Sequence, residues 1–118
     1  MRQIRRCSEE DIAALQSIAY ETYDETFRSM NSAETMEKYL REAFDTEKLV
    51  GELRNAASEF YFMQVDDCVV GYLKLNEAAA QSDLNDPEGL EIERIYVRRQ
   101  FQGKGYGREL MAFALDEA

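Results

Sequence analysis

The chain has 118 residues and a formal net charge of −10, with 24 acidic side chains, 14 basic ones and no histidine. This length allows one small domain and excludes two separate hydrophobic cores. An acidic chain lacks the basic face that phosphate backbones require, so we expect no nucleic-acid partner. Without histidine, Ser-His and Cys-His nucleophile pairs and His-liganded metal sites are excluded, and we expect no bound metal.

Cysteine usage and the N-terminal sequence bear on the compartment. Cys7 and Cys68 lie far apart, without a CxxC pair or companion ligands. We interpret them as ordinary structural thiols in a reducing compartment. Charges occupy the N-terminal stretch where a signal peptide would be apolar, and no apolar run approaches the roughly 18 residues of a membrane span. We therefore expect a cytoplasmic protein without a membrane partner.

The first half of the chain is typical of a short strand followed by helices. Residues 3–7 are a candidate edge strand. An acidic first turn and the apolar spacing predict a helix over residues 9–23. Asn31 and Glu34 form a capping-box pattern that begins a second helix, and Asp45 caps a shorter third one. The second helix has an apolar face made by Met36, Tyr39, Leu40 and Phe44.

The second half changes period and predicts a hairpin and a further strand. The hairpin segments, 60–65 and 68–75, are rich in β-branched and aromatic residues, and a polar connection over 76–88 leads to a strand over 89–97. Alternation along that strand predicts one face with Leu90, Ile92, Arg94 and Tyr96. The other face would carry Glu91, Glu93, Ile95 and Val97, so that two carboxylates share a face.

A glycine-rich loop joins this strand to the last helix and carries the sharpest chemical signal. Glycines at 103, 105 and 107 remove side chains near the start of a helix whose first N–H groups are unpaired. Such a loop can hold a pyrophosphate without a metal, although a flexible turn is the plain alternative. The spacing matches neither the Rossmann nor the P-loop motif. The helix has an apolar stripe of Leu110, Met111, Phe113, Ala114 and Leu115.

The pattern Gln102-x-x-Gly105-x-Gly107 and the strand LEIERIYV before it resemble motif A of the GNAT superfamily of acetyl-CoA-dependent N-acetyltransferases. The order of elements is also similar to that family. Among its members, the segments ETYDETF, FYFMQVDDCVVGYLKLN and LEIERIYV resemble the bacterial spermine/spermidine N-acetyltransferases of the PaiA kind. The resemblance implies an α+β fold, an α/β sandwich in which antiparallel strands precede the motif A helix, with a single domain over residues 1–118.

The resemblance also implies how acetyl-CoA would be held as a cosubstrate. Backbone groups at the strand end, in Ile95, Tyr96 and Val97, would pair with the pantetheine arm like an added strand. The pyrophosphate would be surrounded by backbone N–H groups of Gly103, Lys104, Gly105, Tyr106, Gly107 and Arg108. The side chains of Lys104 and Arg108 either add charge there or are solvated.

The implied reaction is attack of a neutral amine on the acetyl thioester, which needs a group that accepts a proton. Glu91 occupies the strand position at which some GNATs place a general base, and Glu93 is the second candidate. Either carboxylate could instead pair with Arg94 or Arg98. The acceptor would lie against residues 20–31, whose acidic and aromatic side chains suit a polyamine. These side chains include Glu21, Tyr23, Asp24, Glu25 and Phe27.

Members of the family continue past the motif A helix with further strands and a helix that usually bears the tyrosine acid for the leaving thiolate. Because those elements are not in these residues, we expect a truncated chain with an open sheet edge that could form homo-oligomers. The predicted function is transfer of an acetyl group to a primary amine such as spermidine or spermine. The alternatives are an inactive acyl-CoA-binding or regulatory module on the same fold, and an unrelated α+β interaction domain with an accidental glycine signature.

Overall fold

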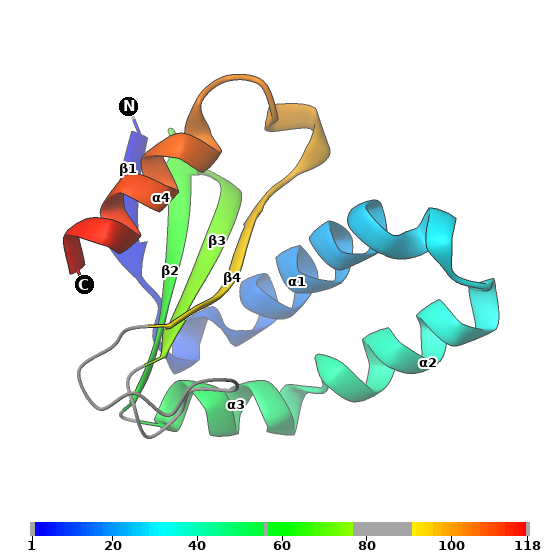
Figure 1. Cartoon of the computed structure of the whole chain (residues 1–118). Coiled ribbons are helices and arrows are strands. Elements are labelled where there is room, and N and C mark those ends of the chain that lie inside the picture. The colour runs from blue at the N-terminus through cyan, green and yellow to red at the C-terminus, as the bar shows by residue number, and fades with distance from the viewer. Residues whose placement is uncertain (1, 56, 77–90, 118) are drawn as a thin grey trace.

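The computed structural model describes residues 2–55, 57–76 and 91–117 (Figure 1). Its first half holds β1 (Arg2–Arg6), the 3-10 turn η1 (Glu9–Asp11), α1 (Ile12–Phe27), the turn η2 (Arg28–Met30), α2 (Ala33–Ala43) and α3 (Thr46–Arg54). Its second half holds β2 (Ser58–Val65), β3 (Cys68–Asn76), β4 (Glu91–Val97), the turn η4 (Arg99–Phe101) and α4 (Tyr106–Glu117). The predicted order of strand, helices, hairpin, strand, glycine loop and helix is confirmed.

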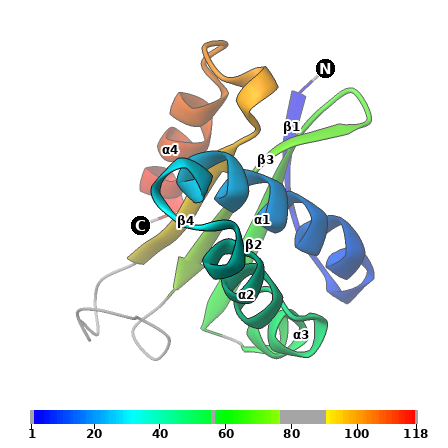
Figure 2. The same cartoon turned by 90° about the vertical axis from the view of Figure 1, so that its right-hand side faces the viewer.

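The described strands form one antiparallel sheet in the order β1-β2-β3-β4. Figures 1 and 2 show α1, α2 and α3 on one side of this sheet and α4 on the other. This arrangement confirms the predicted α+β sandwich. β4 is the last strand in the order, and within the described residues no strand pairs with its outer edge.

A hydrophobic core lies on each side of the sheet. Along β2, Phe60 and Phe62 face α1–α3, whereas Tyr61 and Met63 face α4. Because successive side chains of a strand point to opposite faces, a sheet covered on both sides needs continuous apolar runs, which explains the sequence FYFM. Each core also receives helical side chains: Leu15, Ile18 and Leu49 on the first side, and Leu110 and Ala114 on the second.

Two predicted helix ends differ from the structure. α1 continues to Phe27 instead of ending near residue 23. The cap of α2 is Ser32, whose hydroxyl accepts the N–H of Thr35 at 3.1 Å, and not Asn31. The Asn31 side chain instead donates to the carbonyl oxygen of Phe27 at 3.0 Å. Asn31 therefore satisfies the end of one helix and leaves the start of the next to its neighbour.

A β-bulge in β4 overturns the predicted alternation of its side chains. Lys74 pairs with Arg94 and Leu75 pairs with Ile92, so Glu93 is an extra residue in the ladder. Glu93 and Arg94 consequently lie on the same face, the one covered by α1–α3. There both belong to one cluster of charged side chains. Ile92, predicted to share a face with Arg94, instead packs in the α4 core. A bulge has no signature in the apolar pattern, so strict alternation could not anticipate it.

The apolar stripe predicted for α4 is wider than the face that the helix buries. Leu110 and Ala114 are fully buried against the sheet, and Phe113 packs edge-on against Tyr61. Met111 and Leu115 remain 39% and 65% exposed. Positions 111 and 115 lie about 100° further round the helix than 110 and 114, beyond the contact with a single sheet.

The described cysteines are free and differ in environment. Cys7 is buried in the core, and burial raises the pKa of its thiol to about 12. Cys68 is exposed at the start of β3, so it contributes no core packing, contrary to the structural role expected for it. Among the described residues no helix is long and apolar enough to cross a membrane. The same residues contain no group of three side chains suited to a metal ion.

Candidate cofactor and acceptor site

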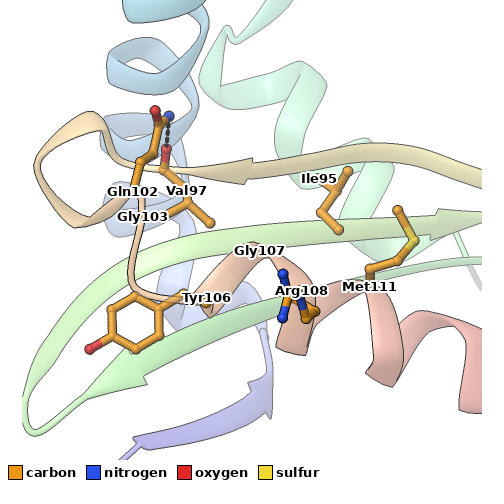
Figure 3. Close-up of a pocket in the computed structure, with 9 residues that line it drawn as sticks. Ile95, Val97, Gln102, Gly103, Tyr106, Gly107, Arg108 and Met111 are labelled. Carbon is orange, nitrogen blue, oxygen red and sulfur yellow. Dashed lines mark hydrogen bonds between the residues drawn. The ribbon is translucent and has the colours of Figure 1, made fainter.

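A cavity of about 480 Å³ lies between the end of β4 and the start of α4 (Figure 3). This volume falls in the range of small-molecule sites, roughly 300 to 1,000 Å³. Its lining contains every residue predicted to hold the cofactor except Tyr96 and Lys104, and adds Gln102 and Met111. Met111 lies one helical turn after Gly107, a spacing that the sequence already contained.

The direction of the main chain in β4 decides which residues could pair with an added strand. The N–H of Arg98 donates to the carbonyl oxygen of Val70 in β3 at 2.8 Å. Hydrogen-bonding direction alternates along a strand, so the main-chain groups of Tyr96 also face β3. Those of Ile95 and Val97 face the outer edge and the cavity. The main-chain groups of Tyr96 therefore point into the sheet, whereas those of Ile95 and Val97 point to its outer edge, where an added strand could pair.

The glycine loop has a backbone conformation that glycine adopts easily and other residues rarely adopt. Gly103 and Gly105 have φ values of +84° and +87°, a region that side chains with a Cβ rarely adopt. Gly107 has no such constraint: a Cβ there would sit 3.7 Å from Val97 Cγ2, an ordinary contact. The side chain of Gln102 ties the loop back to β4 by donating to the carbonyl oxygen of Val97 at 3.0 Å (Figure 3).

The start of α4 supplies main-chain donors to the same cavity. Its first helical hydrogen bond runs from the N–H of Glu109 to the carbonyl oxygen of Gly105, at 3.1 Å. The N–H groups of Gly107 and Arg108 precede it in the first turn, where N–H groups have no acceptor within the helix. These groups, with the positive end of the helix dipole, suit a bound anion. The exposed Arg108 side chain belongs to the same lining.

Gly71 of β3 is a residue that sequence reasoning missed. A Cβ at this position would lie 2.6 Å from the carbonyl oxygen of Tyr96 and 3.2 Å from Leu110 Cδ1. The missing side chain allows β4 and α4 to pack closely just behind the cavity. A glycine within a predicted strand is a known sign of close backbone approach, so the signal was present in the sequence.

Four charged side chains form a compact cluster on the face of the sheet that α1–α3 cover. Lys74, only 5% exposed, places Nζ 2.9 Å from Glu52 Oε2 and 3.0 Å from Glu93 Oε1. The Arg94 guanidinium lies 3.2 Å from Glu52 and 3.3 Å from Glu93. Two cations and two carboxylates thus balance each other where isolated charges would be strongly destabilising.

This cluster determines the state of Glu93, one of the two predicted bases. Burial raises the pKa of Glu93, but hydrogen bonds from Asn76 and Lys74 and the charges of Lys74 and Arg94 outweigh it, so the pKa lies below its usual value. Glu93 is therefore ionised, and both of its carboxylate oxygens have partners within the protein. Glu91 begins β4, and its side chain lies outside what the structure describes.

The acidic residues predicted to meet the acceptor are all engaged inside the protein. Glu21 lies 3.1 Å from Arg98, and Asp24 pairs with Arg28, the first residue of η2, at 2.5 Å. Glu25 accepts the main-chain N–H of Arg99 at 2.9 Å. Glu21 and Asp24 thus have protein cations as partners, and the Glu25 carboxylate has a main-chain N–H.

The aromatic part of the predicted acceptor surface packs against α2. Tyr23 stacks on Tyr39 of α2 with ring centroids 4.4 Å apart, and the Phe27 ring lies tilted to that of Tyr23 at a centroid distance of 4.4 Å. Tyr39 is 43% exposed. Burial, with Tyr39 close by, raises the pKa of the Tyr23 hydroxyl, which stays neutral. Tyr39 was predicted only as part of the apolar face of α2, because its contact with α1 depends on how the two helices pack.

The cavity, the glycine loop and the exposed edge of β4 together match a known family. The model of the Acetyltransferase (GNAT) family matches residues 16–118 of the chain. The chain belongs to this family. The resemblance of the glycine motif and of the element order to GNAT proteins is thereby confirmed.

Relatives of known sequence agree with this assignment. A protein of Lactobacillus delbrueckii subsp. lactis, described as an uncharacterized N-acetyltransferase in the pepI 3′ region, is 46% identical over 112 residues, which cover 95% of this chain and 65% of that protein. The spermidine N(1)-acetyltransferase of Thermoplasma acidophilum is 26% identical over 113 residues, covering 92% of this chain and 65% of that protein. The chain therefore spans 65% of the length of these two relatives.

Solved structures show the same fold. The PaiA N-acetyltransferase of Thermoplasma acidophilum, crystallised in complex with coenzyme A, has a TM-score of 0.81 and 24% identity, covering 98% of this chain and 70% of that one. A GCN5-related N-acetyltransferase from Ralstonia eutropha has a TM-score of 0.71 and 17% identity, covering 99% of this chain and 75% of that one. At these identities the likeness concerns the fold alone.

Proposed function

We propose that the protein carrying this chain transfers the acetyl group of acetyl-CoA to a primary amine. One observation carries this proposal: the outward main-chain groups of Ile95 and Val97 and the N–H groups at the start of α4 meet in one cavity. An extended arm with amides and a pyrophosphate at its far end needs those two kinds of group in that order. Membership of the GNAT family supports the choice of acetyl-CoA.

We propose that main-chain groups supply most of the binding. The pantetheine arm would run along Ile95 and Val97 as an added strand, and the pyrophosphate would lie over the glycine loop and the first turn of α4. Gly103 and Gly105 hold the loop in a shape that other residues rarely adopt. Lys104 does not line the cavity, so we assign its side chain no contact, whereas Arg108 is placed to add charge.

The chemistry that follows is nucleophilic substitution at the thioester. The amine nitrogen bonds to the carbonyl carbon, the carbon–sulfur bond breaks, and the sulfur leaves as a thiolate that must regain a proton. An amine with a pKa of about 10 is almost wholly protonated at neutral pH, so a group must first take its proton. Glu91 and Glu93 remain the proposed bases. Because Glu93 already accepts hydrogen bonds from Asn76 and Lys74, Glu91 is the first of the two to test.

We propose a polyamine, such as spermidine or spermine, as the acceptor. The likeness to a spermidine N(1)-acetyltransferase, the net charge of −10 and the aromatic surface of Tyr23 and Tyr39 support it. The aromatic rings suit the alkyl segments and ammonium groups of such a molecule. The free thiols of the described cysteines support a cytoplasmic location. Within the described residues no strand pairs with the outer edge of β4, and self-association through this edge is the alternative to its use by the pantetheine arm.

An acyl-CoA-binding module without catalysis is the second candidate, favoured by one observation: Glu93 is held in ion pairs inside the protein. Calorimetric titration with CoA, followed by thiol release from acetyl-CoA with a panel of amines, separates the two. We expect CoA binding and turnover with polyamines. Binding without turnover for any amine would favour the module, and the absence of binding would contradict both.

The base assignment has a matched pair of variants. We expect Glu91→Gln to lower turnover at pH 7 by about 100-fold or more while leaving CoA affinity unchanged, because a positioned base contributes on that order. Raising the pH should recover part of the loss, since more free amine is then present. Glu93→Gln is the control on the same strand. If only Glu93→Gln loses turnover, Glu93 is the base, and if neither does, both assignments are wrong.

A further inference from the structure

We infer that Glu21 and Glu25 of α1 are positioning residues for the cofactor, because they hold the segment that enters the glycine loop. This inference rests on the proposed function for its meaning, since it concerns the site that would bind CoA. It gives these two carboxylates a role different from binding the amine. The described contacts carry it in three steps.

The first step is a reciprocal cap between α1 and η4. The main-chain N–H of Arg99, the first residue of η4, donates to Glu25 Oε1 at 2.9 Å. In return, the Arg99 guanidinium donates to the carbonyl oxygen of Glu25. Glu25 lies in the last turn of α1, where carbonyl groups have no N–H donor within the helix, and the first N–H groups of η4 equally lack an acceptor there. Each segment therefore satisfies the end of the other.

The second step is an ion pair one helical turn earlier. Glu21 lies on the same face of α1 as Glu25, and its carboxylate is 3.1 Å from Arg98 Nε. The Arg98 side chain is mostly buried, and its main-chain N–H is held by Val70 of β3 at 2.8 Å. α1 is thus fastened to the chain at the point where β4 leaves the sheet.

The third step leads from these contacts to the cavity. The N–H groups of Phe101 and Gln102 donate to the carbonyl oxygens of Arg98 and Arg99, so the shape of η4 depends on where those two arginines are held. Gln102 then bonds back to Val97, and Gly103 and Gly105 follow. Glycines have more conformational freedom to lose than other residues, so a loop of this composition needs external contacts to stay ordered.

A consequence is that α1 and the cofactor loop move together. If the acceptor contacts α1 as proposed, its binding and that of CoA are coupled through Glu21 and Glu25, and each ligand changes the affinity of the other by the same factor. The carboxylates that the sequence offered to an ammonium group therefore act on the cofactor side. The aromatic side chains are left to meet the acceptor.

The test uses hydrogen exchange and CoA titration on the chain, with Glu25→Ala as the first variant. We expect the hydrogen-bonded amides of Phe101 and Gln102 at the loop entrance to exchange about tenfold faster and the Kd for CoA to rise about tenfold, the effect of losing one charge-assisted hydrogen bond there. Asp24→Ala is the matched control, because the partner of Asp24 is Arg28, four residues further along the chain in η2. It should leave both quantities within about twofold of the wild type.

Two further variants keep the test decisive. Glu25→Gln preserves the size of the side chain and one acceptor oxygen, so it replaces Glu25→Ala if that variant fails to fold. It should give a smaller increase in loop exchange and in the Kd for CoA than the loss of the whole carboxylate. Glu21→Arg and Arg98→Glu should each raise the Kd, and their combination should restore it, which a general loss of stability would not do. If the loop amides of the Glu25 variants exchange no faster than those of Asp24→Ala, the inference is wrong. Absence of CoA binding by the wild type would instead contradict the proposed function, while loop exchange would still decide this inference.

Discussion

Around the glycine loop the candidate site consists mainly of main-chain groups, whereas on the side of β4 that faces α1–α3 it consists of charged side chains. The first region needs only glycines and a helix start, all within residues 102–108. The second region brings Glu52, Lys74 and Arg94 together from three different elements. The two regions share β4, which has its open edge on one side and its bulge on the other.

A site built within one loop and a cluster built from several elements respond differently to mutation. Main-chain binding is sensitive to backbone shape and to added charge, and tolerant of small side chains where φ is ordinary. A buried charge cluster is sensitive to the loss of any one partner, because the remaining charges stay buried. Variants in the first region should therefore affect ligand affinity, and variants in the second should affect stability.

Lys74→Met should have the largest effect on stability. It leaves the partly buried carboxylates of Glu52 and Glu93 with Arg94 as their remaining cation, which we expect to cost about 3 kcal/mol of unfolding free energy. Urea unfolding measures this loss. Lys48→Met, at an exposed position of α3, is the control and should change stability by less than about 0.5 kcal/mol. Equal effects would show that the cluster contributes no more than a surface lysine.

Gly105→Glu should have the largest effect on CoA binding. The φ of +87° disfavours any residue with a Cβ, and a carboxylate would repel the pyrophosphate. We expect the Kd to rise by about 100-fold or more in calorimetric titration, corresponding to roughly 3 kcal/mol. Since nothing in the described structure lies within 4 Å of a Cβ at this position, the fold should survive, as circular dichroism can check. Unchanged affinity in a folded variant would contradict the site.

The pH dependence of stability should distinguish the two regions further. The pKa of Glu93 is lower in the folded chain than in the unfolded one, where it is about 4.3. The ionised carboxylate therefore stabilises the fold fully above that pH, and the stabilisation is lost as the pH falls through the lower folded pKa. We expect the Tm of the wild type to fall more steeply from about pH 5 to about pH 3 than that of Glu93→Gln. Parallel curves would show that the ion pairs of Glu93 do not form.

Gly107→Ala should have the smallest effect. Its Cβ would meet Val97 Cγ2 at 3.7 Å, an ordinary contact, and alanine favours a helix by up to about 1 kcal/mol over glycine. We expect CoA affinity to stay within about twofold of the wild type and stability to rise slightly. A large loss of affinity, measured beside Gly105→Glu, would mean that the ligand itself needs the space at residue 107.

The sequence by itself determined the features that depend on neighbouring residues. The order of elements, the continuous apolar run of β2 and the glycine loop follow from local periodicity and from the conformational range of glycine. The main-chain groups proposed to hold the cofactor could be named for the same reason. Only the choice between Tyr96 and its neighbours needed the pairing of β4 with β3.

Tertiary structure alone decided the partners of the charged side chains. No local pattern could show that Glu93 would occupy a bulge beside Lys74, or that Glu25 would accept a hydrogen bond from Arg99, 74 positions further along the chain. A carboxylate has the same local propensities whether it binds an ammonium ligand or an arginine of its own protein. The choice depends on which cation packing brings within about 4 Å, and that distance is set by the contact of α1 and α3 with the sheet.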